Sequence, residues 1–461
     1  MRILTAFLLI ALIITPSCRA KETKEANHTD GILSIQEVTS KSGITAWLVE
    51  DHTLPIISLK FSFKGAGSIN DSLDKQGLVL LLSNTMDEGA GNLRSQEFQK
   101  MLSDHSITLR FNSNRDNFGG QLKTLSRNQD KAFELLKSAL NAPRFDAEPI
   151  ERMRAANIAR IKSSLSDPEW IAARILNDKA FDNHPYAQNS GGTLTSLPNI
   201  TADDLKTHKQ NHLTKDRLII GVTGGITAQE LKKTLDAIFG DLPSSNKEKP
   251  TKNEQALIKN GGKNFLFEQD IPQTIIRVSM PSLDNQHADY PALQVLNYIF
   301  GGGGFGSRLM EEAREKRGLT YGIYSHLYAL DQMNSFNIST STKNESTSEM
   351  MRIIRDELTR LRETPVSTQE LQSAKDYIIG SMPLSLTSTD KISSILLSMQ
   401  LNERPITYLD TLANKINRVT IEDIQRVATD LLQSDNLTTI MVGQPENITD
   451  TVKIEKLPNV Y

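Results

Sequence analysis

The pattern of apolar and polar residues predicts strands and helices that alternate along both halves of the chain. Runs of β-branched and aromatic residues, or strict apolar–polar alternation, are typical of strands, whereas apolar residues three and four apart are typical of helices. The predicted strands cover residues 46–49, 56–63, 107–111, 121–125, 275–280, 322–328 and 335–341. The predicted helices cover residues 131–140, 150–165 and 349–362. We therefore expect an α+β fold, with an antiparallel-rich sheet and helices on one face.

The same order of elements occurs twice along the chain. Residues 200–205 (ITADDL) resemble residues 419–424 (VTIEDI), and each stretch leads through a helix into a predicted strand, at 217–222 and 436–441. The two threonines are 219 positions apart (420 − 201), and so are the two strand starts (436 − 217). A constant offset over several elements indicates a duplication, and its period is far too long for a solenoid. The sequence thus predicts two homologous domains.

A polar stretch separates the two repeats. Residues 243–255 contain few apolar side chains, as is typical of a connection on the surface. We expect a first domain over residues 31–242, a linker over 243–256 and a second domain over 257–458.

The first 20 residues have the features of an export signal. Arg2 precedes an uncharged apolar run over residues 3–14, which is too short to span a bilayer, and small residues follow it. Cys18 is the only cysteine, and it leaves two alternatives open: lipidation of Cys18 as the first mature residue, or ordinary cleavage after Ala20. In both cases the body of the chain has no disulfide. We expect a protein of the periplasm or cell envelope of a bacterium.

The charge of the chain argues against two classes of partner. The net charge is −3 at pH 7, and residues of both signs are interspersed. Such a surface does not attract nucleic acid or an anionic membrane over long distances. Contact with a membrane is expected only through a lipid anchor at Cys18.

The segment over residues 301–325 (GGGGFGSRLMEEAREKRGLTYGIYS) carries the candidate chemistry. Gly301, Gly302, Gly303 and Gly304 predict a turn that can adopt positive φ and let another backbone approach closely. An amphipathic helix is expected next, with Gly318 just after its end and a strand from about Leu319. Arg314 then lies in the last helical turn, seven positions before Tyr321.

The doubled α+β domain, the export signal and this segment together resemble the pitrilysin (insulinase-like) family of zinc metallopeptidases. The resemblance extends over residues 33–443, and in the first domain it rests on residues 65–68 (GAGS) and 75–78 (KQGL). In active members the helix that begins there carries H-x-x-E-H, whose two histidines bind zinc and whose glutamate is the general base. The resemblance implies two homologous domains that form half of a clamshell.

The chain departs from the family at the metal site. Aligned through Gly77-Leu78 and Gly89, Leu80 and Asn84 occupy the two histidine positions and Ser83 occupies the glutamate position. The third ligand of the family, a glutamate, falls at or beside Arg160, within residues 157–161. Leucine has no lone pair for a metal, and a guanidinium repels one. The chain is therefore expected to bind no cofactor and to cleave no peptide on its own.

The other histidines do not replace the missing site. His208 and His212 are four apart at the end of a predicted helix, but no adjacent acid completes a metal motif, which favours a packing role. His184-Pro185-Tyr186 is interpreted as a structural turn.

The resemblance implies a role for Arg314 and Tyr321, because active members use such a pair to contact the substrate carbonyl beside the zinc. The first hypothesis is a non-catalytic partner subunit of a heterodimeric zinc metallopeptidase that degrades short unfolded peptides. A homologous subunit with an intact H-x-x-E-H would bring the zinc, and Gly301–Gly304 would contact the substrate. The alternative is a catalytically inert peptide-binding or structural subunit of a larger assembly. For the two residues themselves, the alternative to contact with the substrate is a surface ion pair for Arg314 and packing under the sheet for Tyr321. A metal-independent enzyme is disfavoured, because neither a recognisable Ser/His/Asp signature nor a cysteine in the body is present.

Overall fold

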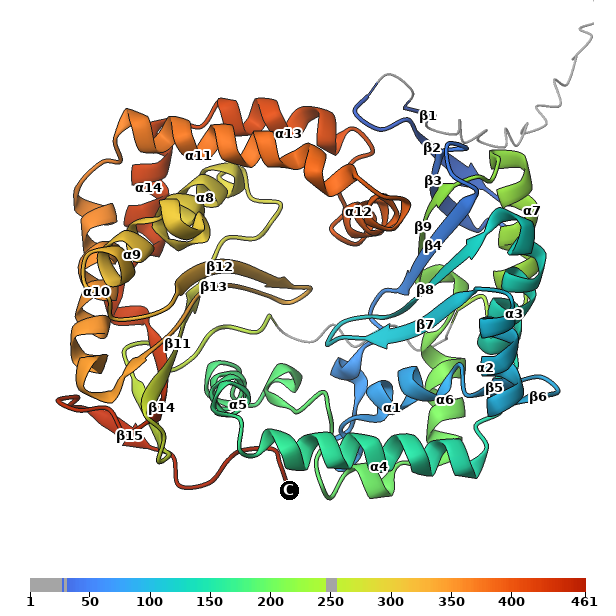
Figure 1. The fold of residues 1–461 in the computed structure, drawn as a ribbon, viewed down its shortest axis with the longest axis horizontal. Coiled ribbons are helices and arrows are strands. Elements are labelled where there is room, and N and C mark those ends of the chain that lie inside the picture. The colour runs from blue at the N-terminus through green and yellow to red at the C-terminus, as the bar shows by residue number, and fades with distance from the viewer. Residues whose placement is uncertain (1–26, 29–30, 246–254) are drawn as a thin grey trace, which may run out of the picture.

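Two sheets organise the chain, one in each half of the sequence (Figure 1). The computed structural model describes residues 27–28, 31–245 and 255–461. The predicted signal, Cys18 and most of the predicted linker lie outside these residues. We refer to residues 27–245 as the first half and to residues 255–461 as the second half. Among the described residues, no helix is both long enough and apolar enough to cross a bilayer.

The first sheet has seven strands in the order β1-β2-β3-β9-β4-β8-β7. Its strands are β1 (Asn27–His28), β2 (Ile35–Thr39), β3 (Thr45–Glu50), β4 (Ile56–Phe63), β7 (Thr108–Ser113), β8 (Phe118–Leu125) and β9 (Leu218–Gly224). All neighbours are antiparallel except β3 and β9. A separate short pair consists of β5 (Gly89–Ala90) and β6 (Leu93–Arg94). The helices of this half are α1 (Leu78–Thr85), α2 (Ser95–Asp104), α3 (Gln129–Asn141), α4 (Ala147–Ser164), α5 (Pro168–Ala180), α6 (Ala202–His212) and α7 (Ala228–Phe239).

The second sheet has six strands in the order β12-β13-β11-β14-β10-β15. Its strands are β10 (Asn264–Glu268), β11 (Gln273–Pro281), β12 (Ile323–Leu330), β13 (Met333–Lys343), β14 (Thr438–Gly443) and β15 (Thr451–Lys453). The helices of this half are α8 (Tyr290–Asn297), α9 (Arg308–Met310), α10 (Thr347–Glu363), α11 (Thr368–Ser381), α12 (Thr389–Leu401), α13 (Tyr408–Asn417) and α14 (Ile421–Leu431). The predicted fold class, α+β with two sheet-containing domains, is confirmed.

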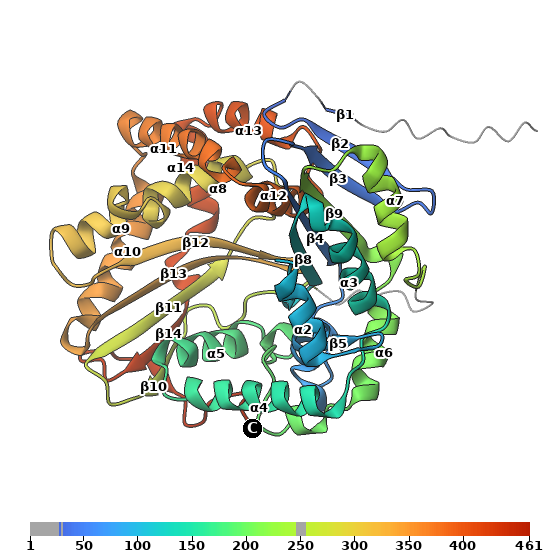
Figure 2. The same cartoon turned by 45° about the vertical axis from the view of Figure 1, so that its right-hand side comes forward.

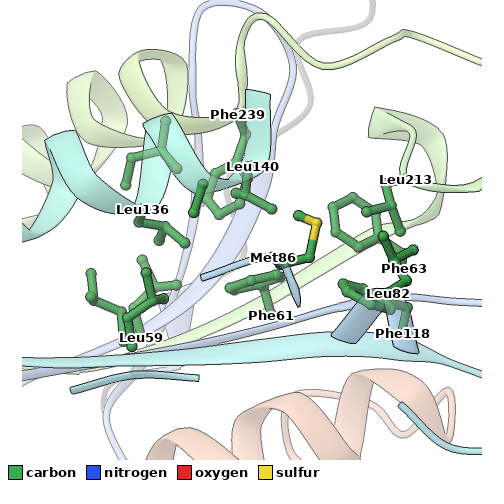
Figure 3. Packing of buried hydrophobic residues seen from close by; sticks show 14 of the residues in the cluster. Leu59, Phe61, Phe63, Leu82, Met86, Phe118, Leu136, Leu140, Leu213 and Phe239 are labelled. Carbon is green, nitrogen blue, oxygen red and sulfur yellow. The ribbon is translucent and has the colours of Figure 1, made fainter. Parts of the chain in front are cut away.

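Side-chain alternation on β4 explains how the first half forms its core. Leu59, Phe61 and Phe63 are buried on one face of the strand, and Figure 3 shows them packed together with Leu136 of α3 and Phe239 of α7. Successive side chains of a strand point to opposite faces, so the intervening Ser58, Lys60 and Ser62 face the other way. Helices α3 and α7 therefore lie on the face of the first sheet that carries Leu59, Phe61 and Phe63.

The opposite face of each sheet is covered by one helix from the other half. On the first sheet, α12 packs with Ile392, Leu396 and Met399 against Trp47 and Val49 of β3. On the second sheet, α5 packs with Ile171, Ala172 and Ile175 against apolar residues of β10, β11 and β14. The two helices occupy equivalent places in the repeats, since their first residues are 221 positions apart (389 − 168). Figures 1 and 2 show this reciprocal exchange, which the sequence did not predict.

The duplication is visible in local capping as well. Thr201 accepts a hydrogen bond from the backbone N–H of Asp204 at the start of α6, and Thr420 does the same with Asp423 at the start of α14. In both helices the backbone N–H of the threonine donates in turn to the carboxylate of the aspartate. Each capping box satisfies two N–H groups that a helix terminus otherwise leaves without an acceptor. The same 219-residue offset thus holds for hydrogen bonds, not only for residue types.

Candidate functional site

Helix α1 carries the residues that correspond to the metal ligands, and its start is built around Asp71. Gly77 precedes the helix with φ of 88°, and a Cβ there would lie 2.7 Å from the Cα of Gly192. The carboxyl group of Asp71 accepts the backbone N–H groups of Gly77 (2.9 Å) and Val79 (3.3 Å), in place of a side-chain cap. Burial raises the pKa of Asp71 to about 8. The start of α1 is therefore held by a buried carboxyl and by close backbone packing.

The residues at the metal positions form a small polar network between α1 and α4. Asn84 donates from Nδ2 to Oδ1 of Asn157 (3.0 Å), and Nη2 of Arg160 donates to the same oxygen (2.6 Å). The Ser83 hydroxyl bonds within its own helix, to the carbonyl of Leu80 (2.8 Å). Asn157 is 2% exposed, and its Nδ2 has no partner in the described part of the chain. An amide pair and a guanidinium thus lie at the positions that the sequence resemblance aligns with the metal ligands of the family.

This network does not fit a zinc ion. Carboxamides are weak ligands, Leu80 offers no donor atom, and the guanidinium of Arg160 adds a positive charge. Among residues 27–28, 31–245 and 255–461, no three histidine, cysteine, aspartate or glutamate side chains gather as a metal site requires.

The tertiary structure identifies Asn157 as the residue opposite Asn84. The sequence placed the third ligand position at or beside Arg160, within residues 157–161. Positions three apart share one helix face, so Asn157 and Arg160 both face α1, and the nearer side chain is Asn157. This i, i+3 spacing is the signal that could have found Asn157.

The glycine-rich segment differs in detail from its prediction. Of the four glycines, only Gly304 has a positive φ, of 58°. Gly301 is needed for close approach instead, because a Cβ there would lie 2.7 Å from the backbone nitrogen of Ser325 on β12. Wider helical turns at η7 (Tyr298–Gly302) and η9 (Glu311–Glu315) flank the short α9, in place of one regular helix. The strand begins at Ile323, within the predicted range of residues 322–328 but four residues after the start expected at about Leu319.

Arg314 and Tyr321 come together, although not through the tyrosine hydroxyl. Nη1 of Arg314 donates to the backbone carbonyl of Tyr321 at 2.6 Å, and its guanidinium lies 4.6 Å from the ring centre of Phe305. Tyr321 is 83% exposed and Phe305 is 66% exposed. The expected alternative, with a surface ion pair for Arg314 and a tyrosine under the sheet, is therefore wrong. The sequence also missed Phe305, which lies between Gly304 and Gly306 and stacks on the guanidinium.

The polar network at α1 and the pair of Arg314 and Tyr321 lie apart within this chain. The main neighbours of α1 are α4, α6 and β7, all in the first half. The main neighbours of α9, which precedes η9, are η7, η9, α10 and β12, all in the second half. Figure 1 shows α1 and α9 in different halves of the molecule. Arg314 and Tyr321 therefore cannot act on a site at α1 of the same chain in this arrangement.

The histidines serve packing and turns. The rings of His208 and His212 stack at 4.3 Å, and Nε2 of His208 lies 3.2 Å from the carbonyl of Ala66. Burial lowers the pKa of His208 to about 3 and that of His212 to about 4. His184 accepts the backbone N–H of Tyr186 at Nδ1 and contacts the Gln332 side chain from Nε2 (3.1 Å).

Comparison with known protein families matches both halves of the chain. Residues 57–193 match the model described as insulinase (peptidase family M16). Residues 199–378 match the model described as peptidase M16 inactive domain.

Curated relatives and solved structures agree with these matches. A "non-peptidase homolog YmxG" of Helicobacter pylori is 26% identical over 388 residues, which are 81% of this chain and 86% of that protein. A "probable inactive metalloprotease YmfF" of Bacillus subtilis is 26% identical over 415 residues, or 85% of this chain and 94% of that protein. The crystal structure of a peptidase M16 inactive domain from Pseudomonas fluorescens superposes with a TM-score of 0.83 at 25% identity, covering 92% of this chain and all of that chain.

Proposed function

Because this chain belongs to the M16 (insulinase) family of peptidases, as an inactive homologue, we propose that it is the non-catalytic subunit of a heterodimeric zinc metallopeptidase. The partner would be a homologous chain with an intact H-x-x-E-H, and it would bring the zinc and the general base. The substrates would be short unfolded peptides. We further propose that the pair works outside the cytoplasm, as the export signal predicts.

The observation that carries the proposal is that the guanidinium of Arg314 is held in a fixed orientation at the surface, although the described residues form no metal site beside it. Its guanidinium is oriented by the ring of Phe305 and by the carbonyl of Tyr321, which leaves further N–H groups for a ligand. At α1, the Asn84–Asn157 pair and Arg160 cannot replace zinc ligands. A cationic side chain oriented at the surface, in a family whose chemistry needs one beside a carbonyl, supports a role in a site of another chain.

The chemistry proposed for these residues is stabilisation of charge. When water attacks a peptide bond, the carbonyl oxygen becomes negative, and pre-oriented donors stabilise it better than water does. The guanidinium of Arg314 and the hydroxyl of Tyr321 are such donors. The segment Gly301–Gly304 would lie against the peptide backbone, because glycines allow close approach.

Co-expression with a zinc-bearing homologue tests the proposal. Arg314→Ala and Tyr321→Phe should lower peptide cleavage by the pair about 100-fold each, as the loss of an oxyanion donor does, with pairing intact on size exclusion. Matched controls are Arg317→Ala, at an arginine that pairs with Glu312, and Tyr328→Phe on β12. The isolated chain should contain far less than one zinc ion per molecule.

Two outcomes would count against this function. Full activity of pairs that contain Arg314→Ala or Tyr321→Phe would contradict the proposed role of these two residues. Stable association without cleavage would favour the inert peptide-binding or structural subunit instead.

A further inference from the structure

A cleft far from Arg314 in sequence has features of a ligand site. Two adjoining hollows, of about 410 and 350 Å³, are lined by residues of α8 and α13, two helices that pack against each other (Figures 1 and 2), and the smaller hollow is also lined by α12. They share Asn285, Tyr290, Gln294, Arg404, Tyr408 and Leu412. We call the two hollows together the Arg404 cleft.

Arg404 is held at the junction of the two hollows. Its guanidinium lies 4.8 Å from the ring centre of Tyr408 and 5.8 Å from that of Tyr290, and Nη2 donates to the carbonyl of Asn285. Cation–π contacts of this kind orient a guanidinium without neutralising its charge. Within the described ranges, Arg404 has no carboxylate partner. A fixed guanidinium with free N–H groups is a preferred partner for a carboxylate.

The larger hollow has an excess of positive charge. Lys415 and Arg418 line it, and neither forms an ion pair with any residue that the structure describes. Its two carboxylates, Asp289 and Asp423, are both bound by Arg426. Arg426 offsets part of the charge of these two acids, and the three cations that line the hollow, Arg404, Lys415 and Arg418, outnumber them, so the hollow favours an anion.

The smaller hollow is apolar, and a polar group with no partner lies at the junction. Met382, Leu386, Ile395, Met399 and Leu409 contribute its walls. Gln294 lines both hollows, and its Oε1 is buried without a hydrogen-bond donor in the described part of the chain. A buried acceptor without a partner costs free energy, so this oxygen can accept a hydrogen bond from a donor on a ligand, such as an N–H group.

We propose that the Arg404 cleft binds the C-terminal end of a peptide whose last residue is apolar. The terminal carboxylate would pair with Arg404, with Lys415 and Arg418 nearby, and the last side chain would enter the apolar hollow. The last backbone N–H would donate to Oε1 of Gln294. A fatty acid also offers a carboxylate and an apolar chain, but it has no N–H group for Gln294. The choice of a peptide rests on the proposed function, in which peptides are the substrates.

Binding to this chain alone tests the inference, with no partner subunit present. A short, uncharged, labelled peptide that ends in leucine should raise fluorescence anisotropy on binding. Amidation of its C-terminus should weaken binding about tenfold, since the charge-assisted pair is lost. Arg404→Gln should weaken binding of the free acid by a similar factor and remove the difference between acid and amide.

Two further variants separate the site from a folding defect. Lys415→Gln/Arg418→Gln changes exposed side chains only, and it should weaken binding of the free acid several-fold, in a salt-dependent way. Arg127→Gln, at an exposed arginine in the short helical turn η3 (Ser126–Asn128) that follows β8, is the matched control and should bind as the unmodified chain does.

Equal binding of acid and amide would overturn the inference, and so would unchanged binding by Arg404→Gln and by the double variant. Binding of a fatty acid without binding of the peptide would overturn it as well. If the chain binds the peptide acid but forms no active pair with a zinc-bearing homologue, the peptide site at the Arg404 cleft is supported and the proposed heterodimer is contradicted. If the pair is active but the isolated chain binds acid and amide equally, the heterodimer is supported and the peptide site at the Arg404 cleft is contradicted.

Discussion

At the scale of single residues, the stacked pair of His208 and His212 is the clearest electrostatic feature of the first half. His208 is 4% exposed, and burial is the main reason why both pKa values fall, to about 3 and about 4. Arg217 lowers both further, because its positive charge opposes a second cation. Both rings are therefore neutral in the folded protein near pH 7. At the end of α6 the two neutral rings thus contribute packing and no charge.

This pair predicts loss of stability in acid. In the unfolded chain histidine titrates near 6.5, so between pH 6.5 and about 4 the unfolded state binds more protons than the folded state. Stability is therefore fully present above pH 6.5 and falls as the pH decreases. Between pH 7.5 and pH 5, each ring should lower the free energy of unfolding by at most about 2 kcal/mol.

His212→Phe keeps a stacked ring and removes one titrating group, so it should remove about half of that pH dependence. Denaturant unfolding at pH 7.5 and pH 5 measures the difference. The control is His287→Phe, which replaces a histidine whose side chain is 49% exposed. If His212→Phe behaves like this control, the stacked pair does not set the acid response.

At the scale of elements, the exchanged helices α5 and α12 join the two halves. Their interfaces differ in chemistry. The contact of α5 with the second sheet is largely apolar and includes an ion pair of Glu169 with Arg277 of β11, whereas at α12 the carboxylate of Asp390 accepts hydrogen bonds from the Ser58 hydroxyl (2.8 Å) and the Lys123 ammonium (3.3 Å). Gly221 on β9 makes the contact with α12 possible, because a Cβ there would lie 2.8 Å from the carbonyl of Ser393 and 3.0 Å from Cβ of Leu396.

Gly221→Val should displace α12 from the first sheet. The new side chain meets helix backbone, which cannot move aside as a flexible side chain can, so we expect a loss of about 3 kcal/mol in the free energy of unfolding. Limited proteolysis should also become faster in the connections beside α12. The control is Gly380→Ala in α11, where nothing lies within 4 Å of the added carbon and a small gain is expected. Equal proteolysis of the two variants would show that Gly221 does not hold α12.

At the scale of the whole molecule, further contacts join the halves, and two of them involve the β12–β13 hairpin and the C-terminal tail. The tip of the β12–β13 hairpin reaches the first half, where the N–H of Asp331 donates to Asp116 (3.0 Å). The C-terminal tail also returns to the first half. There the carbonyl of Val460 accepts the N–H of Leu194 (2.7 Å), and the side chain of Val460 is 1% exposed within the first core. Residues from the last positions of the sequence thus complete the core of the first repeat.

Val460→Asp should loosen this attachment. A carboxylate in an apolar core without a partner is strongly unfavourable, so we expect the tail to detach, with a loss of about 3 kcal/mol. Hydrogen exchange should then become faster at Leu194 and its neighbours. Val452→Asp, at a position on β15 that is 47% exposed, is the matched control. Unchanged exchange at Leu194 in Val460→Asp would contradict a structural role for the tail.

Local features of the sequence determined most of the secondary structure and the duplication. The strand at 56–63 coincides with β4, because alternation of Ile57, Leu59 and Phe61 with polar residues depends only on neighbours along the chain. The repeated Thr201 and Thr420 mark helix starts for the same reason, since a capping box closes within four residues. The absence of metal-ligand residue types at Leu80, Ser83 and Asn84 could also be seen directly in the sequence.

Contacts between distant residues were decided only by the tertiary structure. No local pattern shows that α12 covers the sheet of the other repeat, because the apolar side of a helix does not encode which surface it meets. The same holds for Asn157 opposite Asn84, for Phe305 beneath Arg314 and for the Arg404 cleft. The sequence by itself therefore determined which elements form and which chemistry is missing, since both depend on neighbouring residues. The tertiary structure decided which side chains meet, because packing and burial bring together residues up to hundreds of positions apart.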